Sequence, residues 1–311
     1  MAPIVHWDEL ERERGEEGDQ LASYWTALGR PAGSVNVGVN RIEIDAGKRS
    51  TPLHREMGEE EIFFVLGGSG LSWQHDGEQD LTFEIRAGDC LVHLAGAEAH
   101  SLVAGRDGLD VIAFGAYTDS EFTFFPRLHG ARMGPVWIPE LETHQWTAEA
   151  ALGSPDLPDP SPRPSRIVNV DELPDEEWGK GEIQSTSREL GVAAGSKRSG
   201  ISYVKVAAGK LNVPPHCHSA EEEVFVVLGG EGVCLLGDEE HPVRRGHVVA
   251  RPAGTRVAHA FRAGNSGLEL LSYGTREPND IAYYPRSNKL NFRGVGVITR
   301  LDRLDYWDGE A

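Results

Sequence analysis

The chain repeats itself, and this duplication constrains its fold more than any other feature. IVHWDEL, which begins at Ile4, recurs as IVNVDEL, which begins at Ile167. AGKRSTPLH ends at His54 and AGKLNVPPH ends at His216, and this offset of 162 residues persists through EEEIFFVLGGSG and EEEVFVVLGGEG. Further along, FFPR and YYPR recur at an offset of 159 residues. Repeats of this length are whole domains rather than the units of a solenoid.

A proline-rich segment separates the two copies. GSPDLPDPSPRPS, at 153–165, carries five prolines, a composition suited to an extended and semi-rigid linker. A chain of 311 residues is long enough for two domains that each bury a core. We therefore predict an N-terminal domain over 1–150, a linker over 151–165 and a C-terminal domain over 166–311.

The hydrophobic pattern predicts an all-β protein. Each copy consists of short runs rich in Val, Ile, Phe and Tyr that are separated by glycine pairs, as in EVFVVLGGEGVCLLGDEEHPVRRGHVVARPAG. Brief strands with frequent turn signals are typical of antiparallel barrels and sandwiches. Few helices are expected, and the best helical candidate is the acidic stretch 8–28, which we expect on the exterior of the barrel.

Charge and cysteine content exclude several classes of protein. The net charge of -19 argues against a nucleic-acid partner, because binding to phosphates requires a basic face. The three cysteines form no Cys-x-x-Cys pair and indicate free thiols in a reducing compartment. The N-terminal residues become charged before an apolar signal core can form, and no segment reaches the length of a membrane span. We expect a cytoplasmic monomer or homodimer with a small-molecule partner and no membrane partner.

The segment PPHCHSAEEEVFVVLGG holds the histidines best placed to bind a metal ion. His216 and His218 lie two residues apart on a predicted strand, so both side chains project from one face. Cys217 lies between them and points the other way, which excludes it as a ligand. A further ligand is expected from a strand distant in sequence, and RGHVVARPAGTRVAHAF supplies His259.

The acidic run of this segment supplies a carboxylate. Period-two alternation places Glu223 in phase with Phe225, on the face that points into the barrel. Glu221 has the same parity and Glu222 the opposite one, so a one-residue bulge would transfer the ligand role. The other two glutamates of the run are expected in a solvated turn.

These residues together resemble the signatures of the cupin superfamily. The first signature is His-x-His followed by Glu and Gly, and the second is Gly, Pro, Gly and a final His. They occur here as His216, His218, Glu223 and Gly230, then Gly246, Pro252, Gly254 and His259. The resemblance covers nearly the whole chain as two successive cupin domains, a bicupin. It implies two jelly-roll, or double-stranded β-helix, barrels that each bind a metal ion in the mouth.

The N-terminal copy departs from these signatures. PLHREMGEEEIFFVLGG offers His54 and Glu61 but has Glu56 where the second histidine is expected, and AGDCLVHLAGAEAH supplies His100. Two imidazoles and two carboxylates suit a hard or borderline cation. The alternative is a barrel that no longer binds metal and is retained for packing. His93 is a spare ligand candidate.

Two further features carry weaker expectations. The repeated segments FFPR at 124–127 and YYPR at 283–286 are expected to mark packing between the barrels, because repetition in both copies favours an architectural role. Arg251 and Arg256 flank the mouth of the C-terminal barrel in sequence and are candidates for binding an anionic substrate.

The predicted C-terminal ligands indicate an enzyme. Three imidazoles and one carboxylate suit Fe, Mn, Ni, Co, Cu or Zn, with positions open for water, oxygen or a chelating substrate. The resemblance implies first a metal-dependent dioxygenase or related oxidoreductase that acts on a small oxygenated molecule. Glu223 is the catalytic candidate, because it either completes the coordination or accepts a proton.

Other functions remain open at this point. A metal-dependent decarboxylase, lyase or sugar isomerase would use the same ion as a Lewis acid. Chemistry like that of oxalate decarboxylase would lead us to expect His-x-His in both copies. A non-catalytic cupin that binds a metal ion or a small molecule is the third alternative, because fold alone does not determine function.

Overall fold

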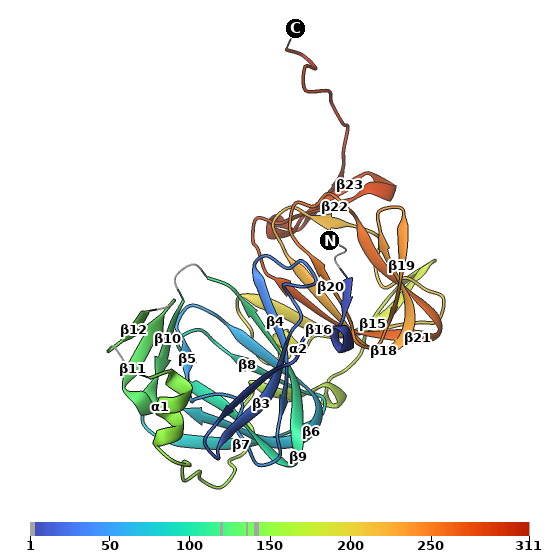
Figure 1. The fold of residues 1–311 in the computed structure, drawn as a ribbon. Coiled ribbons are helices and arrows are strands. Elements are labelled where there is room, and N and C mark those ends of the chain that lie inside the picture. Colours follow the sequence, from blue (N-terminus) through green and yellow to red (C-terminus); the bar gives the residue numbers. More distant parts are fainter. Residues whose placement is uncertain (1–3, 119–120, 135, 140–142, 311) are drawn as a thin grey trace.

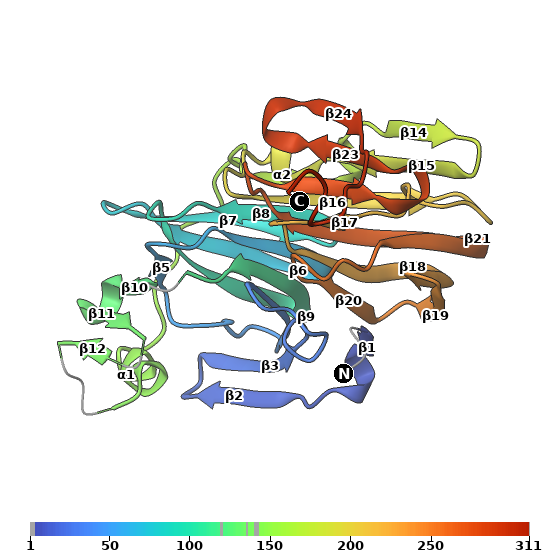
Figure 2. The same ribbon diagram turned by 90° about the horizontal axis from the view of Figure 1, so that it is seen from above.

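The computed structural model describes residues 4–118, 121–134, 136–139 and 143–310. Two β-barrels lie side by side in both views (Figure 1 and Figure 2), and each combines an eight-stranded sheet with a four-stranded one. The predicted all-β class with two tandem jelly-roll barrels is confirmed. The α-helices of the described residues are short, α1 (Gln145–Ala151) and α2 (Leu190–Ala193), and none is long and apolar enough to cross a membrane.

The N-terminal barrel is built mainly from the first sequence copy. Its larger sheet contains β2 (Glu13–Glu17), β3 (Leu21–Ala27), β4 (Val37–Ile44), β6 (Glu61–His75), β7 (Asp80–Arg86), β8 (Asp89–His93), β9 (Ala99–Ala116) and β13 (Ile167–Asn169). Its smaller sheet contains β5 (Arg55–Glu56), β10 (Phe122–Phe125), β11 (Gly130–Met133) and β12 (Val136–Ile138).

The C-terminal barrel repeats this plan. Its larger sheet contains β1 (Ile4–His6), β14 (Glu176–Lys180), β15 (Ile183–Arg188), β16 (Ser199–Val206), β18 (Glu223–Leu236), β19 (Glu239–Arg244), β20 (His247–Arg251) and β21 (His259–Thr275). Its smaller sheet contains β17 (Cys217–His218), β22 (Ile281–Tyr284), β23 (Lys289–Phe292) and β24 (Val297–Arg300).

The two copies exchange their first strands. β1 pairs with β20 of the C-terminal barrel, with Ile4 opposite Val249, and Figure 1 shows the N-terminus beside that barrel. β13 pairs with β8 of the N-terminal barrel, with Ile167 opposite Leu91. Each larger sheet therefore ends on a strand from the other copy, and the segment 151–165 separates that strand from the rest of its sheet in the sequence.

The repeated glycine pairs bend the long strands. Register shifts interrupt the pairing of β6 with β9 and of β18 with β21 at these glycines. Gly68 and Gly230 have φ of 80° and 72°, a region that favours glycine. A Cβ at either position would overlap the carbonyl oxygen of Gly108 or Gly267 on the neighbouring strand. The motif is thus a bulge that curves each strand around its barrel.

An apolar interface joins the barrels. One buried cluster combines residues of both copies, including Ile62 and Phe64 of the first and Val224 of the second. At its centre the rings of Phe114 and Tyr273, which are repeat equivalents, stack with centroids 5.0 Å apart. Burial of large aromatic rings contributes strongly to such interfaces.

Two buried carboxylates cross this interface in opposite directions. Glu222 accepts hydrogen bonds from the N-terminal barrel at 2.6, 2.9 and 2.8 Å, from Ser34 Oγ, Val35 N and Asn36 N. Its repeat equivalent Glu60 accepts bonds from the segment 196–199 of the C-terminal barrel. Glu222 is buried, so the expectation that it lies in a solvated turn is wrong. Because its carboxylate accepts hydrogen bonds from the other barrel, it stabilises the interface.

The helix expected over 8–28 is absent, and that prediction is wrong. A short 3-10 turn, η1 (Trp7–Glu9), is followed by the hairpin of β2 and β3. β2 is the last strand of its sheet, where most of its acidic side chains reach solvent while the backbone bonds to β3. Position at a sheet edge thus overrides the helical preference of an acid-rich stretch.

Candidate metal centre

Four predicted ligands gather in the C-terminal barrel. His218 lies on β17, Glu223 begins β18 and His259 begins β21, while the backbone of His216 bonds to that of His259 in both directions. The donor atoms of His216, His218 and Glu223 lie within 4.8 Å of one another. Nε2 of His259 lies 2.9 Å from Oε2 of Glu223, which joins this ring to the group.

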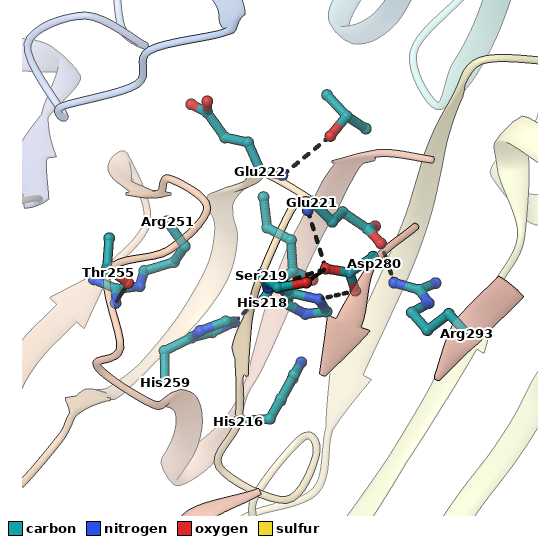
Figure 3. A network of polar contacts seen from close by, with 12 residues as sticks. His216, His218, Ser219, Glu221, Glu222, Arg251, Thr255, His259, Asp280 and Arg293 are labelled. Carbon is teal, nitrogen blue, oxygen red and sulfur yellow. Dashed lines mark hydrogen bonds and ion pairs between the residues drawn. The ribbon is translucent and has the colours of Figure 1, made fainter. Parts of the chain in front are cut away.

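The two imidazoles of the His-x-His motif are oriented by their outer nitrogens. Nδ1 of His216 lies 2.9 Å from the carbonyl oxygen of Pro214, and Nδ1 of His218 lies 2.6 Å from Oδ2 of Asp280 (Figure 3). These bonds leave Nε2 of each ring to face Glu223. Metal-binding histidines are commonly held in this way by a bond on the other ring nitrogen.

The buried polar atoms at the centre of the group face one another. Nε2 of His218 and Nε2 of His259 lie 3.2 and 2.9 Å from the same atom, Oε2 of Glu223. Among the described residues, no polar group outside the cluster bonds to these three atoms. Three imidazole nitrogens and a carboxylate suit a divalent transition metal, so the residues fit a bound ion.

The electrostatics of the group favour a cation. Burial and the neighbouring His259 lower the pKa of His216 to about 4, and burial also lowers the pKa of His259. Burial disfavours the charged form of Glu223, but His259 and His218 hold its pKa well below the ordinary value. Burial also opposes a charge on His218, yet hydrogen bonds to Asp280 and Glu223 raise its pKa to about 10. A cation bound here would therefore compete with the proton of His218.

The N-terminal barrel brings its four predicted ligands together as well. Donor atoms of His54, Glu56, Glu61 and His100 lie within 4.8 Å of one another. Nε2 of His54 lies 2.9 Å from Glu56, and Nε2 of His100 lies 2.8 Å from Glu61. The cluster therefore forms two histidine–carboxylate pairs.

The protonation of this cluster differs from that of the C-terminal one. Burial opposes a charge on His54, but Glu56 raises its pKa to about 9. Burial and the nearby Glu56 raise the pKa of Glu61 well above the ordinary value. The spare candidate His93 stacks on His100 with centroids 3.9 Å apart and bonds to Glu98 through Nδ1, so it lies behind His100.

A cavity of about 410 Å³ opens above the C-terminal cluster. His216, His218 and Glu223 are part of its wall, and Phe225 lines it in phase with Glu223, as the alternation predicted. Tyr284 stacks on His216 with centroids 5.5 Å apart and also lines the cavity.

The aromatic repeats belong to the sites. Tyr284 contacts His216, and its repeat equivalent Phe125 stacks on His54 with centroids 6.1 Å apart. The expectation that these segments mark packing between the barrels is therefore wrong. Tyr284 ends β22, which pairs with β17, and Phe125 ends β10, which pairs with β5, so the repeat places one aromatic ring beside each histidine cluster.

The two arginines proposed for substrate binding are absent from the described wall of this cavity, although Arg251 lies opposite Glu223 in the sheet. Arg251 is buried and bonds to Thr255 and to the carbonyl oxygen of Val257, on the side of His259 away from Asp280 (Figure 3). Arg256 is exposed, and neither residue lines the cavity above the cluster. A substrate role for either residue remains a prediction.

Sequence reasoning missed Asp280 and Arg293. Asp280 accepts hydrogen bonds from His218 and from the backbone N of Ala220 and Glu221 at 3.0 and 3.1 Å. Arg293 lines the cavity and pairs with Glu221, which is buried rather than solvated as expected. Alignment of the copies pairs Asp280 with Glu121, and this repeated acid was the available signal.

Comparison with known sequences identifies the domain type. The family described as Cupin domain matches residues 202–273, in the C-terminal barrel. Over 75 residues the chain is 35% identical to the auxin-binding protein T85 of Nicotiana tabacum. That stretch covers 24% of this chain and 39% of the relative, so the chain spans about two fifths of that relative's length.

Comparison with solved structures covers both barrels. Oxalate decarboxylase from Bacillus subtilis at pH 4.6 superposes with a TM-score of 0.60 at 16% identity, over 87% of this chain and 75% of that one. The formate complex of oxalate decarboxylase from Lactobacillus farciminis gives 0.60 at 14% identity, over 88% and 85%. At these identities the likeness shows a shared fold of two barrels in one chain.

Proposed function

We propose that this protein is a bicupin enzyme that uses a divalent ion of its C-terminal barrel as a Lewis acid, a proposal supported by the match of residues 202–273 to the Cupin domain family and by the shared fold of two barrels. Its substrate would be a small oxygenated organic molecule, and its reaction a decarboxylation, another lyase reaction or an isomerisation. The observation that carries this proposal is the convergence of three imidazoles and one buried carboxylate in the wall of a cavity.

Each residue of the group has a definite task in this proposal. His216, His218, His259 and Glu223 would hold the ion, which would polarise a carbonyl or carboxylate oxygen of the substrate. Asp280 orients His218 through its 2.6 Å bond and supports the negative charge that the site needs. Glu223 either remains a ligand or accepts a proton from the substrate.

The type of reaction differs from our first expectation. A dioxygenase was favoured by the sequence, whereas the similar solved structures are oxalate decarboxylases and support the decarboxylase or lyase alternative. The N-terminal copy lacks the second histidine of the His-x-His motif, which argued against chemistry like that of oxalate decarboxylase. The N-terminal cluster nevertheless assembles four donors, with Glu56 in place of the histidine, and is a proposed second cation site.

A non-catalytic role in ligand binding is the second candidate. It is supported by the 75-residue similarity to a relative whose name describes it as auxin-binding. A binding protein would retain a bound ligand unchanged, so turnover separates the two candidates.

Elemental analysis and oxygen uptake test the proposal. We expect the wild-type protein to hold Mn, Fe, Co, Ni, Cu or Zn, His218→Ala to lose the C-terminal ion, and His54→Ala to retain it. Turnover without stoichiometric oxygen consumption would support the Lewis-acid role, whereas oxygen consumption equal to turnover would support the dioxygenase hypothesis. If the wild type and both variants hold no metal after reconstitution, both metal-dependent hypotheses are refuted.

A further inference from the structure

The C-terminal cavity is larger than a two-carbon acid requires. Its volume of about 410 Å³ lies within the range of pockets that bind small organic ligands. At about 30 Å³ for each water-sized group, it has room for roughly fourteen such groups. A substrate about the size of a monosaccharide would fill it.

Three polar residues of the cavity wall have apolar equivalents in the N-terminal barrel. Ser187, Glu189 and Ser272 line the cavity, and the repeat pairs them with Trp25, Ala27 and Ala113. The shared fold therefore does not require polar groups at these three positions. Ser187 and Glu189 bond to Trp178 and Ser202, whereas the hydroxyl group of Ser272 makes no hydrogen bond among the described residues and is available to a ligand.

Several of these polar groups are free to bind a ligand. Within the described part of the chain, the side chains of Ser272 and Asn291 make no hydrogen bond, although both line the cavity. The side-chain oxygen of Asn212 accepts a hydrogen bond from the backbone N of Phe261 at 2.8 Å. Its two amide N–H groups are available to donate to a ligand. Hydroxyl and amide groups of this kind both donate and accept, as the hydroxyl groups of a polyol require.

The rim adds an aromatic face and a cation. Trp178 is 59% exposed, and its Nε1 donates to Ser187 Oγ at 3.2 Å, which holds the indole ring at the edge of the cavity. Such a ring offers an apolar face to C–H groups beside a polar edge. Arg293 is the one lysine or arginine among the described residues of the cavity wall, and only one of its nitrogens pairs with Glu221. A guanidinium with free N–H groups is suited to a carboxylate.

We propose that the C-terminal cavity binds a polyhydroxylated carboxylic acid of about monosaccharide size. Its hydroxyl groups bond to Ser272, Asn291 and Asn212, its carbon chain or ring lies against Trp178, and its carboxylate reaches Arg293. This inference rests on the proposed function. Arg293 pairs with Glu221, whose carboxylate lies within 4.8 Å of a ring nitrogen of His218, so the carboxylate of the substrate would lie beside the metal-binding group.

Calorimetric titration of the manganese-loaded protein tests the inference. The ligands are six-carbon acids that carry hydroxyl groups, a set of aldonates and uronates of differing stereochemistry, with sorbitol and hexanoate for comparison. We expect the best hydroxy acid to bind at least roughly tenfold more tightly than sorbitol or hexanoate. Arg293→Gln should lower the affinity for the acid by roughly tenfold or more and leave sorbitol unchanged, since it removes a charged hydrogen bond.

Two further variants make the test specific. Ser272→Ala introduces the alanine that the N-terminal barrel has at the equivalent position. It should lower the affinity for the hydroxy acid by roughly fivefold, the effect of losing one neutral hydrogen bond, and leave the affinity for hexanoate unchanged. Arg300→Gln, which changes an exposed arginine of β24, should change nothing. Equal binding of hexanoate and every hydroxy acid, or equal effects of Arg293→Gln and Arg300→Gln, would overturn the inference.

Metal content of the same samples separates this inference from the proposed function. A protein that loads metal and turns over an unhydroxylated acid, but binds none of the hydroxy acids, retains the proposed function and refutes the inference. A protein that binds a hydroxy acid through Arg293 without turnover retains the inference and refutes the enzyme.

Discussion

Nδ1 of His218 and Oδ2 of Asp280 lie 2.6 Å apart, although 62 residues separate them in the chain. Asp280 also accepts hydrogen bonds from the backbone that follows His218, so one carboxylate fixes both the ring and its loop. The first prediction follows from this contact, because we propose His218 as a metal ligand.

Asp280→Asn should weaken metal binding by about 10- to 100-fold, because the charge that supports His218 is lost while the side chain keeps its size. Competition with a chelator of known affinity measures the change. Asp238→Asn, at an exposed turn residue of the same barrel, is the control. Unchanged affinity in Asp280→Asn would show that the ring does not need this bond.

Removal of the metal ion should lower the stability of the wild-type protein. A ligand that binds only the folded state at 100 times its Kd stabilises that state by about 2.7 kcal/mol. The unfolding temperature before and after chelation measures this difference, and chelation should change it little in His218→Ala. If chelation does not lower the unfolding temperature of the wild type, the protein holds no stabilising metal ion.

Ser187→Trp should block the C-terminal cavity, because the equivalent Trp25 packs into the core of the N-terminal barrel and bonds to Ser23 at 2.8 Å. We expect loss of ligand binding and turnover with unchanged metal content. Trp25→Ser is the matched change in the other barrel and should leave turnover intact. Retained turnover in Ser187→Trp would exclude this cavity as the substrate site.

Glu222→Gln should destabilise the contact between the barrels, because its amide nitrogen would face the N–H group of either Val35 or Asn36, which donate to different oxygens of Glu222. We expect a loss of about 2 to 4 kcal/mol in the free energy of unfolding, as for other buried charged groups that lose their bonds. Urea unfolding measures the loss. Glu231→Gln, at an exposed residue of β18, should be neutral, and equal losses in the two variants would refute the role of Glu222.

Gly230→Ala and Gly209→Ala separate steric overlap from backbone strain. Both glycines have φ near 70°, but a Cβ at Gly230 would overlap Gly267, whereas a Cβ at Gly209 would have open space. Urea unfolding should show a cost of about 1 to 2 kcal/mol for Gly209→Ala and about twice that or more for Gly230→Ala. Equal costs would mean that the strand bulge adapts to a side chain.

The sequence pattern predicted those features of the candidate site that depend on the direction of a side chain from its own strand. Alternation along a strand places side chains on fixed faces, so it predicted that His216, His218 and Glu223 would gather and that Cys217 would be excluded. The repeat carried the same prediction to His54 and His100. The two tandem barrels followed from the duplication and the strand pattern in the same way.

Contacts between distant segments were decided only by the tertiary structure. Asp280 meets His218 because β22 pairs with β17, and Glu222 is buried because the other barrel supplies its donors. The exchange of β1 and β13 likewise depends on how the barrels pack. A sequence pattern reports the direction of a side chain from its own strand, whereas the partner that it meets depends on the packing of the whole chain.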